Sequence, residues 1–322
     1  MIAKLRIGSR PSALALAQTA IVAGRIRAAA PGLVIEIAPI STSGDKLTSA
    51  SLAQIGGKGL FIRELEQALA GGRIDLAVHS MKDLPAATAP GFRLAAVPRR
   101  ENPRDALLAR SGAGWSSLPH GARLGTASTR RRLMALRARP DLHILPLRGN
   151  VDTRLGKLAG GEFDAIILAM AGLARLGRLE ELRTGGEITV GELDDRTFVP
   201  SGGQGALALE AFGDGPLAGS AEIEAAVAAL DDPQARAETT AERALLAALG
   251  ASCVSPIGVH ARASRDTLAI DAILFSADGA SSLAEAAETR WRFGDLQTAA
   301  NLGRETGELL LARGARDLIG GA

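Results

Sequence analysis

Short apolar runs alternate with helix-forming segments over the first two thirds of this sequence, and this alternation limits the possible folds more than any other feature. The apolar runs predict strands at residues 5–8, 34–40, 74–79, 93–97, 106–109, 144–147, 165–169 and 206–210. Helices are predicted between them, at residues 12–29, 60–70, 129–138, 151–159 and 171–175. Such alternation is typical of doubly wound α/β domains.

The last third follows a different pattern. Helices are predicted at residues 221–230 and 235–249, antiparallel strands at 259–263, 268–275 and 289–293, and a closing helix at 302–312. This order indicates a smaller α+β domain with an antiparallel sheet. Because 322 residues exceed the usual size of one hydrophobic core, two or three domains are expected. Turn-rich segments suit hinges at residues 200–205 and 213–219.

Composition limits the classes of partner. Aromatic residues make up 3% of the chain and tyrosine is absent, so the cores must be aliphatic and few side chains can stack on nucleic acid bases. The formal net charge of +2, from 37 basic and 35 acidic residues, is too small to indicate a polyanion-binding surface. We therefore expect no nucleic acid partner.

The sequence favours neither membrane insertion nor export. Its beginning superficially resembles a signal peptide, but Gln18 and Thr19 interrupt the apolar stretch, and Pro11 and Ser12 fit a turn and a helix cap better. The longest uncharged run, residues 244–261, contains glycine, proline and histidine. One cysteine excludes an internal disulfide framework and fits a reducing compartment. We expect a cytoplasmic protein with no membrane partner.

Cys253 is the single cysteine, in a loop bounded by glycine, serine and proline. A lone thiol on such a loop suggests chemistry, although free cysteine often packs as a small hydrophobic residue. A nucleophilic thiol would need a base, for which His260 is the candidate nearest in sequence. The four histidines lack metal-ligand spacing, so no metal site is expected.

Arginines gather at three predicted turns from strand to helix. The clusters are Arg10 with Ser12, residues 125–128 with Arg130, Arg131 and Arg132, and residues 147–150 with Arg154. Ligands of open parallel sheets bind beyond the carboxyl ends of the strands. Basic residues in a first helical turn oppose the helix dipole, at about 0.3–1 kcal/mol each, unless an anion lies in front of them. Three such clusters favour carboxylate or phosphate binding over a merely solvated surface.

Two further segments lie at predicted turns. Residues 79–83 end a strand and place Asp83 at the same sheet edge as the arginines, where a carboxylate can act as general acid or base, or stabilise a cation. Residues 56–59 are glycine-rich and basic but lack the pattern of a phosphate-binding P-loop. We interpret this second segment as a mobile loop.

Seven motifs in order along the chain resemble those of the porphobilinogen deaminase (hydroxymethylbilane synthase) family. They are RIGSRPSALALAQ (6–18), GGKGLF (56–61), AVHSMKDLP (77–85), PRDA (103–106), LRGNVDTRL (147–155), GGQGA (202–206) and TAERA (240–244). Each motif alone is weak, but the ordered set is specific and covers nearly the whole chain. One departure is Ala251-Ser252-Cys253, where many relatives have Gly-Gly-Cys.

The resemblance implies a transferase of tetrapyrrole biosynthesis that condenses four porphobilinogen molecules into hydroxymethylbilane and releases ammonia. Cys253 would hold a dipyrromethane cofactor through a thioether. Asp83 would be the central catalytic carboxylate and would also contact the cofactor. Lys58 and Phe61 would belong to the loop over the active site.

The resemblance also gives the arginines a task, because every pyrrole carries an acetate and a propionate. The implied cofactor-binding residues, besides Cys253 and Asp83, are Ser80, Lys82, Thr126, Ser128, Arg130, Arg131 and Arg154. The implied substrate-binding residues are Arg10, Ser12, Gln18, Arg148 and Arg175. Arg132 has no role in this scheme.

The implied architecture agrees with the sequence patterns. Two α/β domains resembling the lobes of type II periplasmic binding proteins would comprise residues 1–99 with 199–217, and residues 100–198; a third, α+β domain would comprise 218–322 and carry the cysteine. We expect a monomer. The alternatives are a non-catalytic two-lobed binding protein for small carboxylate or phosphate anions, and a thiol-dependent acyl-transfer enzyme.

Overall fold

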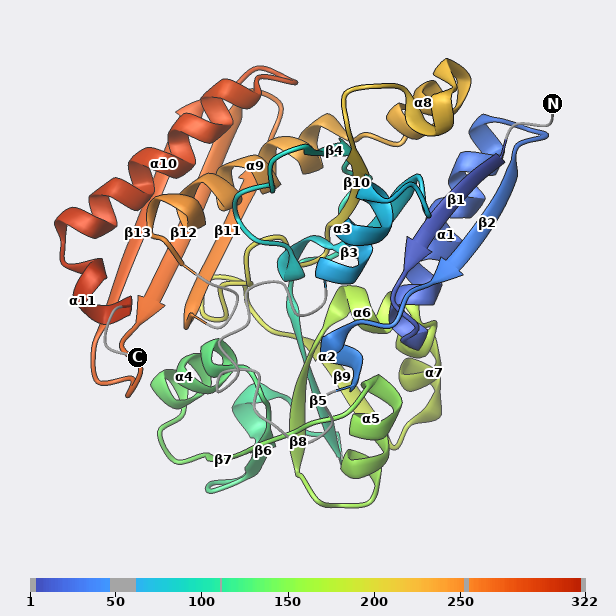
Figure 1. Ribbon diagram of the computed structural model, residues 1–322. Helices are drawn as coiled ribbons and strands as arrows, with labels where there is room; N and C mark the ends of the chain where they lie inside the picture. Colours follow the sequence, from blue (N-terminus) through green and yellow to red (C-terminus); the bar gives the residue numbers. More distant parts are fainter. Residues whose placement is uncertain (1–3, 47–61, 111, 252–254, 320–322) are drawn as a thin grey trace.

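The first sheet of the computed structural model, which describes residues 4–46, 62–110, 112–251 and 255–319, has five strands (Figure 1). Their order is β2 (Val34–Pro39), β1 (Lys4–Ser9), β3 (Leu76–Ser80), β10 (Leu207–Phe212) and β4 (Phe92–Ala96). Strand β1 runs parallel to β2 and β3, whereas β10 runs antiparallel to β3 and β4. The sheet is therefore mixed, with its parallel strands on one side.

Helices pack on this sheet through aliphatic side chains. Val22 and Ile26 of α1 (Ala13–Ala29) share a core with Leu5 and Ile7 of β1, and all four side chains are fully buried. Burial alternates over the first four residues of β1, as the period of two of a strand predicts, and the strand is buried on both faces after that. The other helices that belong with this sheet are α3 (Arg63–Ala70) and α8 (Ala221–Ala228).

The second sheet repeats the strand arrangement of the first. Its order is β7 (His143–Leu145), β6 (Arg123–Gly125), β8 (Ala165–Ala169), β5 (Asp105–Arg110) and β9 (Ile188–Glu192). Strand β6 is parallel to β7 and β8, and β5 is antiparallel to β8 and β9. The helices of this part are α4 (Thr129–Ala138), α5 (Val151–Ala159), α6 (Met170–Arg175) and α7 (Arg178–Gly185).

The chain crosses twice between these sheets. It leaves the first sheet after β4 and enters the second at β5, and it returns between β9 and β10. The two crossings therefore lie within residues 97–104 and 193–206, and they touch, since the Glu101 N–H donates to the Gly205 carbonyl at 3.0 Å. Gly205 has a φ of +88°, and a Cβ there would lie 2.2 Å from the Glu101 oxygen, so this close approach requires glycine.

The last third forms a three-stranded antiparallel sheet, β11 (Ile257–Ala263), β12 (Thr267–Phe275) and β13 (Ser282–Arg290). Helices α9 (Pro233–Ala248) and α10 (Leu296–Ala312) pack on it, followed by the short α11 (Ala315–Ile319) (Figure 1). The two long helices approach closely at Gly303, where a Cβ would lie 2.0 Å from the Ala241 carbonyl oxygen. Ile273 and Phe275 of β12 also pack against α4. The three-stranded sheet therefore contacts the second lobe, which is formed by the second five-stranded sheet and its helices.

A buried ion pair joins α9 to the first crossing. Arg100 donates from Nη1 and Nη2 to the two carboxylate oxygens of Glu242 at 2.8 and 3.2 Å, and Glu242 is fully buried. The same carboxylate accepts the Gly203 N–H of the second crossing at 2.6 Å. Because this one side chain contacts both crossings, it fixes α9 to the two segments that connect the five-stranded sheets.

The predicted α/β organisation, with a smaller α+β part, is confirmed. The predicted strand at residues 289–293 is wrong, because the edge strand is β13, Ser282–Arg290. Its Ala and Glu residues are good helix formers, but exposure alternates at every second residue and the strand pairs along its whole length with β12. The short strands β6 and β9 and helix α7 were not predicted.

Candidate active site

Strand β3 ends in a single 3₁₀ turn, η1 (Met81–Asp83), that presents the predicted catalytic carboxylate. Met81 is buried and its N–H donates to the Ala206 carbonyl at 3.0 Å, which fixes the turn against the second crossing. Lys82 is half-buried, whereas the side chain of Asp83 is exposed. The turn therefore holds one carboxylate open to solvent beside a partly desolvated ammonium group.

Helix α4 begins with a serine cap and two buried arginines. Ser128 Oγ accepts the Arg131 N–H at 3.4 Å, and the Ser128 N–H donates to Thr126 Oγ1 at 3.2 Å. Arg130 Nη2 and Arg131 Nη2 donate to the two oxygens of Asp105 at 2.8 and 2.7 Å. The sequence predicts an anion in front of this helix. For Arg130 and Arg131, that anion is the carboxylate of Asp105 in the chain itself.

Asp105 is fully buried at the first position of β5. Burial raises the pKa of its carboxyl, but the charges of Arg130 and Arg131 outweigh that effect and hold the pKa well below its usual range. Burial lowers the pKa of Arg130, which Asp105 partly offsets. Two guanidinium groups against one carboxylate leave this cluster with a net positive charge.

Three more predicted arginines lie at the ends of neighbouring elements. Arg154 Nε donates to the Gly149 carbonyl at 2.7 Å, and its pKa is lowered by burial and by the charge of Arg131. Arg175 Nη2 donates to the Gly205 carbonyl at 2.5 Å, and burial lowers its pKa to about 10. Arg148 is exposed, two residues before the Asn150 cap of α5.

The predicted substrate residues on the first lobe have partners within the chain. Gln18 is buried and exchanges hydrogen bonds with Ser80 Oγ, at 3.1 and 3.2 Å. Ser12 caps α1 by accepting the Ala15 N–H. The contact of Gln18 with Ser80 joins the first half of α1 to the end of β3, three residues before Asp83.

Arg10 lies against an acidic residue that was not predicted as part of the site. Its Nε and Nη2 donate to Asp45 Oδ1 at 3.1 and 2.5 Å. Asp45 belongs to the short helix α2 (Ser43–Lys46). Burial raises the pKa of Asp45, but hydrogen bonds from Arg10 and Thr42 outweigh it, so the pKa is lowered. The pair joins α2 to the end of β1.

Three predicted site residues, Cys253, Lys58 and Phe61, lie outside the described residues. The sequence patterns missed two buried side chains that are described, Asp105 and Gln204. Both lie inside quoted motifs, PRDA and GGQGA, which were the available signal. Among described residues, no group of three or more acidic, His or Cys side chains is arranged to hold a metal ion.

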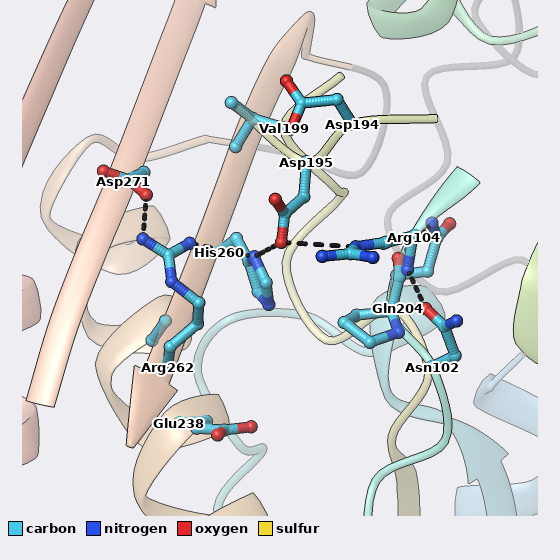
Figure 2. A network of polar contacts seen from close by, with 12 residues as sticks. Asn102, Arg104, Asp194, Asp195, Val199, Gln204, Glu238, His260, Arg262 and Asp271 are labelled. Atoms are coloured by element: carbon cyan, nitrogen blue, oxygen red, sulfur yellow. Dashed lines mark hydrogen bonds and ion pairs between the residues drawn. The ribbon is translucent and has the colours of Figure 1, made fainter. Parts of the chain in front are cut away.

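His260, the candidate base for the thiol, belongs to a polar network at the junction of the crossings and β11 (Figure 2). Its Nδ1 lies 3.2 Å from Arg262 Nη1 and 3.5 Å from Asp195 Oδ2, and Asp195 also pairs with Arg104 at 3.6 Å. Burial and the charges of Arg100, Arg262 and Arg104 lower the pKa of His260 to about 3. The imidazole is therefore neutral and packed within the junction.

We expect His260 to make the protein less stable in mild acid. Below about pH 6.5 the unfolded chain takes up a proton at this histidine that the folded chain rejects, so the free energy of unfolding falls with pH. The loss reaches about 2 kcal/mol at pH 5. Urea unfolding from pH 5 to 8 measures how the free energy of unfolding changes with pH. We expect this pH dependence in wild type to be absent from His260→Gln and retained in His120→Gln, which changes an exposed histidine. Equal slopes in all three proteins would contradict the expectation.

No helix among the described residues is long and apolar enough to cross a membrane.

Comparison with known proteins gives consistent matches. Residues 5–216 match the family model "Porphobilinogen deaminase, dipyromethane cofactor binding domain", and residues 236–312 match "Porphobilinogen deaminase, C-terminal domain". The porphobilinogen deaminase of Roseiflexus castenholzii is 45% identical over 317 residues, covering 98% of this chain and 99% of that protein. That of Chromobacterium violaceum is also 45% identical, covering 98% and 97%.

Among solved structures, a periplasmic binding protein with high arginine specificity from Salmonella typhimurium is 15% identical with a TM-score of 0.38. It covers 70% of this chain and 92% of the other. That likeness is too weak to support a conclusion, whereas the two family models together reach from β1 to the end of α10. On these matches, the chain belongs to the porphobilinogen deaminase family.

Proposed function

We propose that Asp83 is the catalytic carboxylate of this chain and that Cys253 carries its cofactor as a thioether. The chain is a transferase of tetrapyrrole biosynthesis that condenses four porphobilinogen molecules into hydroxymethylbilane and releases ammonia, using a dipyrromethane cofactor. The observation that best supports the residue roles is the gathering of cationic side chains from both lobes around the turn that bears Asp83.

The side chains present fit a dipyrromethane. Each of its pyrroles carries two carboxylates, and guanidinium groups bind carboxylates through paired N–H donors. The arginine cluster at Asp105 keeps a net positive charge, Lys82 adds another, and the charge of Arg131 acts on Arg154. Hydroxyl groups of Thr126 and Ser128 lie at the same helix start. We therefore assign the cofactor to the residues Ser80, Lys82, Asp83, Thr126, Ser128, Arg130, Arg131 and Arg154.

The substrate carboxylates are assigned to Arg10, Ser12, Gln18, Arg148 and Arg175. Four of these residues lie at the carboxyl ends of β1 and β7 or on the helices that follow, and Arg175 ends the helix that follows β8. Lys58 and Phe61 are assigned to the loop over the site. The contacts of Arg10 with Asp45 and of Gln18 with Ser80 then hold these side chains in place before the substrate binds.

Asp83 suits proton transfer because its exposed carboxylate is the last residue of a turn that is fixed against the second crossing. When bound, the dipyrromethane supplies the free pyrrole carbon to which the first substrate is joined and keeps the product attached. Asp83 can give a proton to the amino nitrogen of the substrate as that nitrogen leaves as ammonia, and later take up the proton lost from the accepting carbon. As a carboxylate it also stabilises positive charge on the substrate between those events.

The alternatives have less support. A two-lobed anion-binding protein is not favoured, because the matched relatives are enzymes over nearly the full chain. A thiol-dependent acyl transfer would need His260 as a base, but burial, together with the charges of surrounding arginines, lowers the pKa of His260 to about 3. An imidazole of so low a pKa is a poor proton acceptor.

We also propose three domains, comprising residues 1–99 with 199–217, 100–198 and 218–322, in a cytoplasmic monomer. The three separate sheets and the position of both crossings support the division. The single cysteine supports a reducing compartment.

The intact mass of the purified chain tests the anchor. We expect wild type to exceed its sequence mass by two linked porphobilinogen-derived units and Cys253→Ser to show the sequence mass alone. Wild type that lacks the adduct is incubated with porphobilinogen and weighed again, with Cys253→Ser beside it as the matched control. Normal turnover in Cys253→Ser, or an adduct of equal mass on it, would contradict the proposal.

A further inference from the structure

Gln204 lies on the second crossing, where its side chain meets groups from both lobes. It is 1% exposed. Its Nε2 donates to the Pro103 carbonyl at 2.7 Å and to Asp105 Oδ1 at 2.8 Å, on the first crossing and β5. Its Oε1 accepts from Lys82 Nζ at 3.1 Å and from Arg131 Nη2 at 3.4 Å. One amide thus joins the turn that bears Asp83 to the arginine cluster.

These contacts allow one orientation of the amide. Both groups facing Nε2 are acceptors, and both groups facing Oε1 are cations, so a flipped amide would lose all four contacts. The backbone is equally constrained. Gly203 and Gly205 on either side have φ values of +73° and +88°, and a Cβ at Gly203 would lie 2.6 Å from Met81 Cγ. The position of the side chain is therefore set by both crossings together.

The side-chain oxygen of Gln204 accepts hydrogen bonds from two cations without neutralising them, which a carboxylate could not do. Lys82 and Arg131 are like charges that repel each other, and a shared acceptor stabilises their approach. Because the amide is neutral, it does not cancel either positive charge. Asp105, the nearest buried carboxylate, is already bound by both arginines. Lys82 and Arg131 thus lie side by side, and Gln204 cancels neither positive charge.

We propose that Gln204 is a positioning residue that holds Lys82 beside Arg131 so that both cations bind one carboxylate of the ligand. The inference rests on the proposed function, in which Lys82 and Arg131 bind the cofactor, and adds a residue to which that scheme gives no role. Gln204 acts through Lys82 and is not itself a catalytic residue.

The charge state of Lys82 makes this role measurable. Burial lowers its pKa to about 8, helped by Arg131 and Arg130, while Asp83 and Asp105 act in the opposite direction. A lysine that loses its charge near this pH gives an alkaline limb to any property that depends on the charge. Removing the acceptor at Gln204 disfavours the charged form further, and placing a carboxylate there favours it.

The test compares Gln204→Met, which keeps the length of the side chain, with Gln204→Glu, which makes the acceptor an anion. Enzyme loaded with cofactor, as verified by intact mass, is assayed for hydroxymethylbilane formation from pH 6 to 10. We expect the alkaline limb of kcat/KM to move by about one pH unit to lower pH in Gln204→Met and to higher pH in Gln204→Glu. Opposite shifts are not expected from a loss of stability alone.

Lys82→Arg is the matched control, since its guanidinium stays charged throughout this range and the limb near pH 8 is expected to disappear. If Lys82→Arg removes the limb but both Gln204 variants keep the wild-type profile, or shift it in the same direction, the inference on Gln204 is overturned. If Lys82→Arg keeps the limb, Lys82 is not its source and both the inference and the proposed role of Lys82 fail. If cofactor loading is absent even in wild type, the failure lies with the proposed function.

Discussion

Asp83→Asn is expected to lower kcat by about 100- to 10,000-fold, with the cofactor still attached to the chain. The expected loss is that of removing a general acid or base. Asparagine has nearly the volume of aspartate, and the Asp83 side chain is exposed, so the η1 turn is expected to keep its shape. Single-turnover assays with porphobilinogen measure the rate, and intact mass measures the cofactor in the same sample.

The control for that experiment is Asp214→Asn, an exposed aspartate in the segment after β10. It removes one negative charge without touching the turn, and its kcat is expected to match wild type. Near-normal turnover in Asp83→Asn would remove Asp83 from the catalytic role. Loss of the adduct together with activity would instead assign Asp83 to cofactor assembly or attachment.

The organisation of the fold was predictable because it depends on local pattern. Both α/β lobes were predictable from apolar runs of strand length that alternate with helical segments. The predicted cap Ser12 does cap α1, and Ser128 and Asn150 cap α4 and α5 in the same way. Strand β13 was misplaced because its Ala–Glu sequence suits a helix and forms a strand only through pairing with β12. Pairing of this kind with another strand is not reflected in the strand or helix propensity of the residues themselves.

The site was predictable in part, for a related reason. The prediction that Asp83 and Arg130 share one sheet edge is wrong, because Asp83 follows β3 of the first sheet and Arg130 follows β6 of the second. That each lies just beyond the carboxyl end of a strand could still be predicted from the order of the elements. Their partners could not, because Asp105 is 25 residues from Arg130 and 99 from Gln204 in sequence. The basic residues in the first turn of α4 were interpreted as a sign of a bound anion, and the structure gives Arg130 and Arg131 an internal carboxylate, Asp105, as their partner.

Asp105→Asn is expected to lower the free energy of unfolding by about 3–5 kcal/mol, the cost of leaving a buried partner charge uncompensated. The change leaves Arg130 and Arg131 buried and close together without their carboxylate. Urea unfolding at pH 7, followed by circular dichroism, measures the loss. Since the Asp105 pKa is lowered in the folded state, its stabilisation is complete above about pH 5 and disappears as pH falls.

The matched control is Asp164→Asn. Asp164 also pairs with an arginine, Arg123, at 2.8 Å, but both side chains are more than one third exposed, and such pairs contribute about 0–1 kcal/mol. The double variant Asp105→Asn with Arg130→Met removes one of the two unpaired charges and is expected to recover part of the loss. Equal unfolding midpoints for the Asp105 and Asp164 variants would show that the buried arginine cluster does not depend on its carboxylate. The net positive charge assigned to the cofactor site would then need another source of stabilisation.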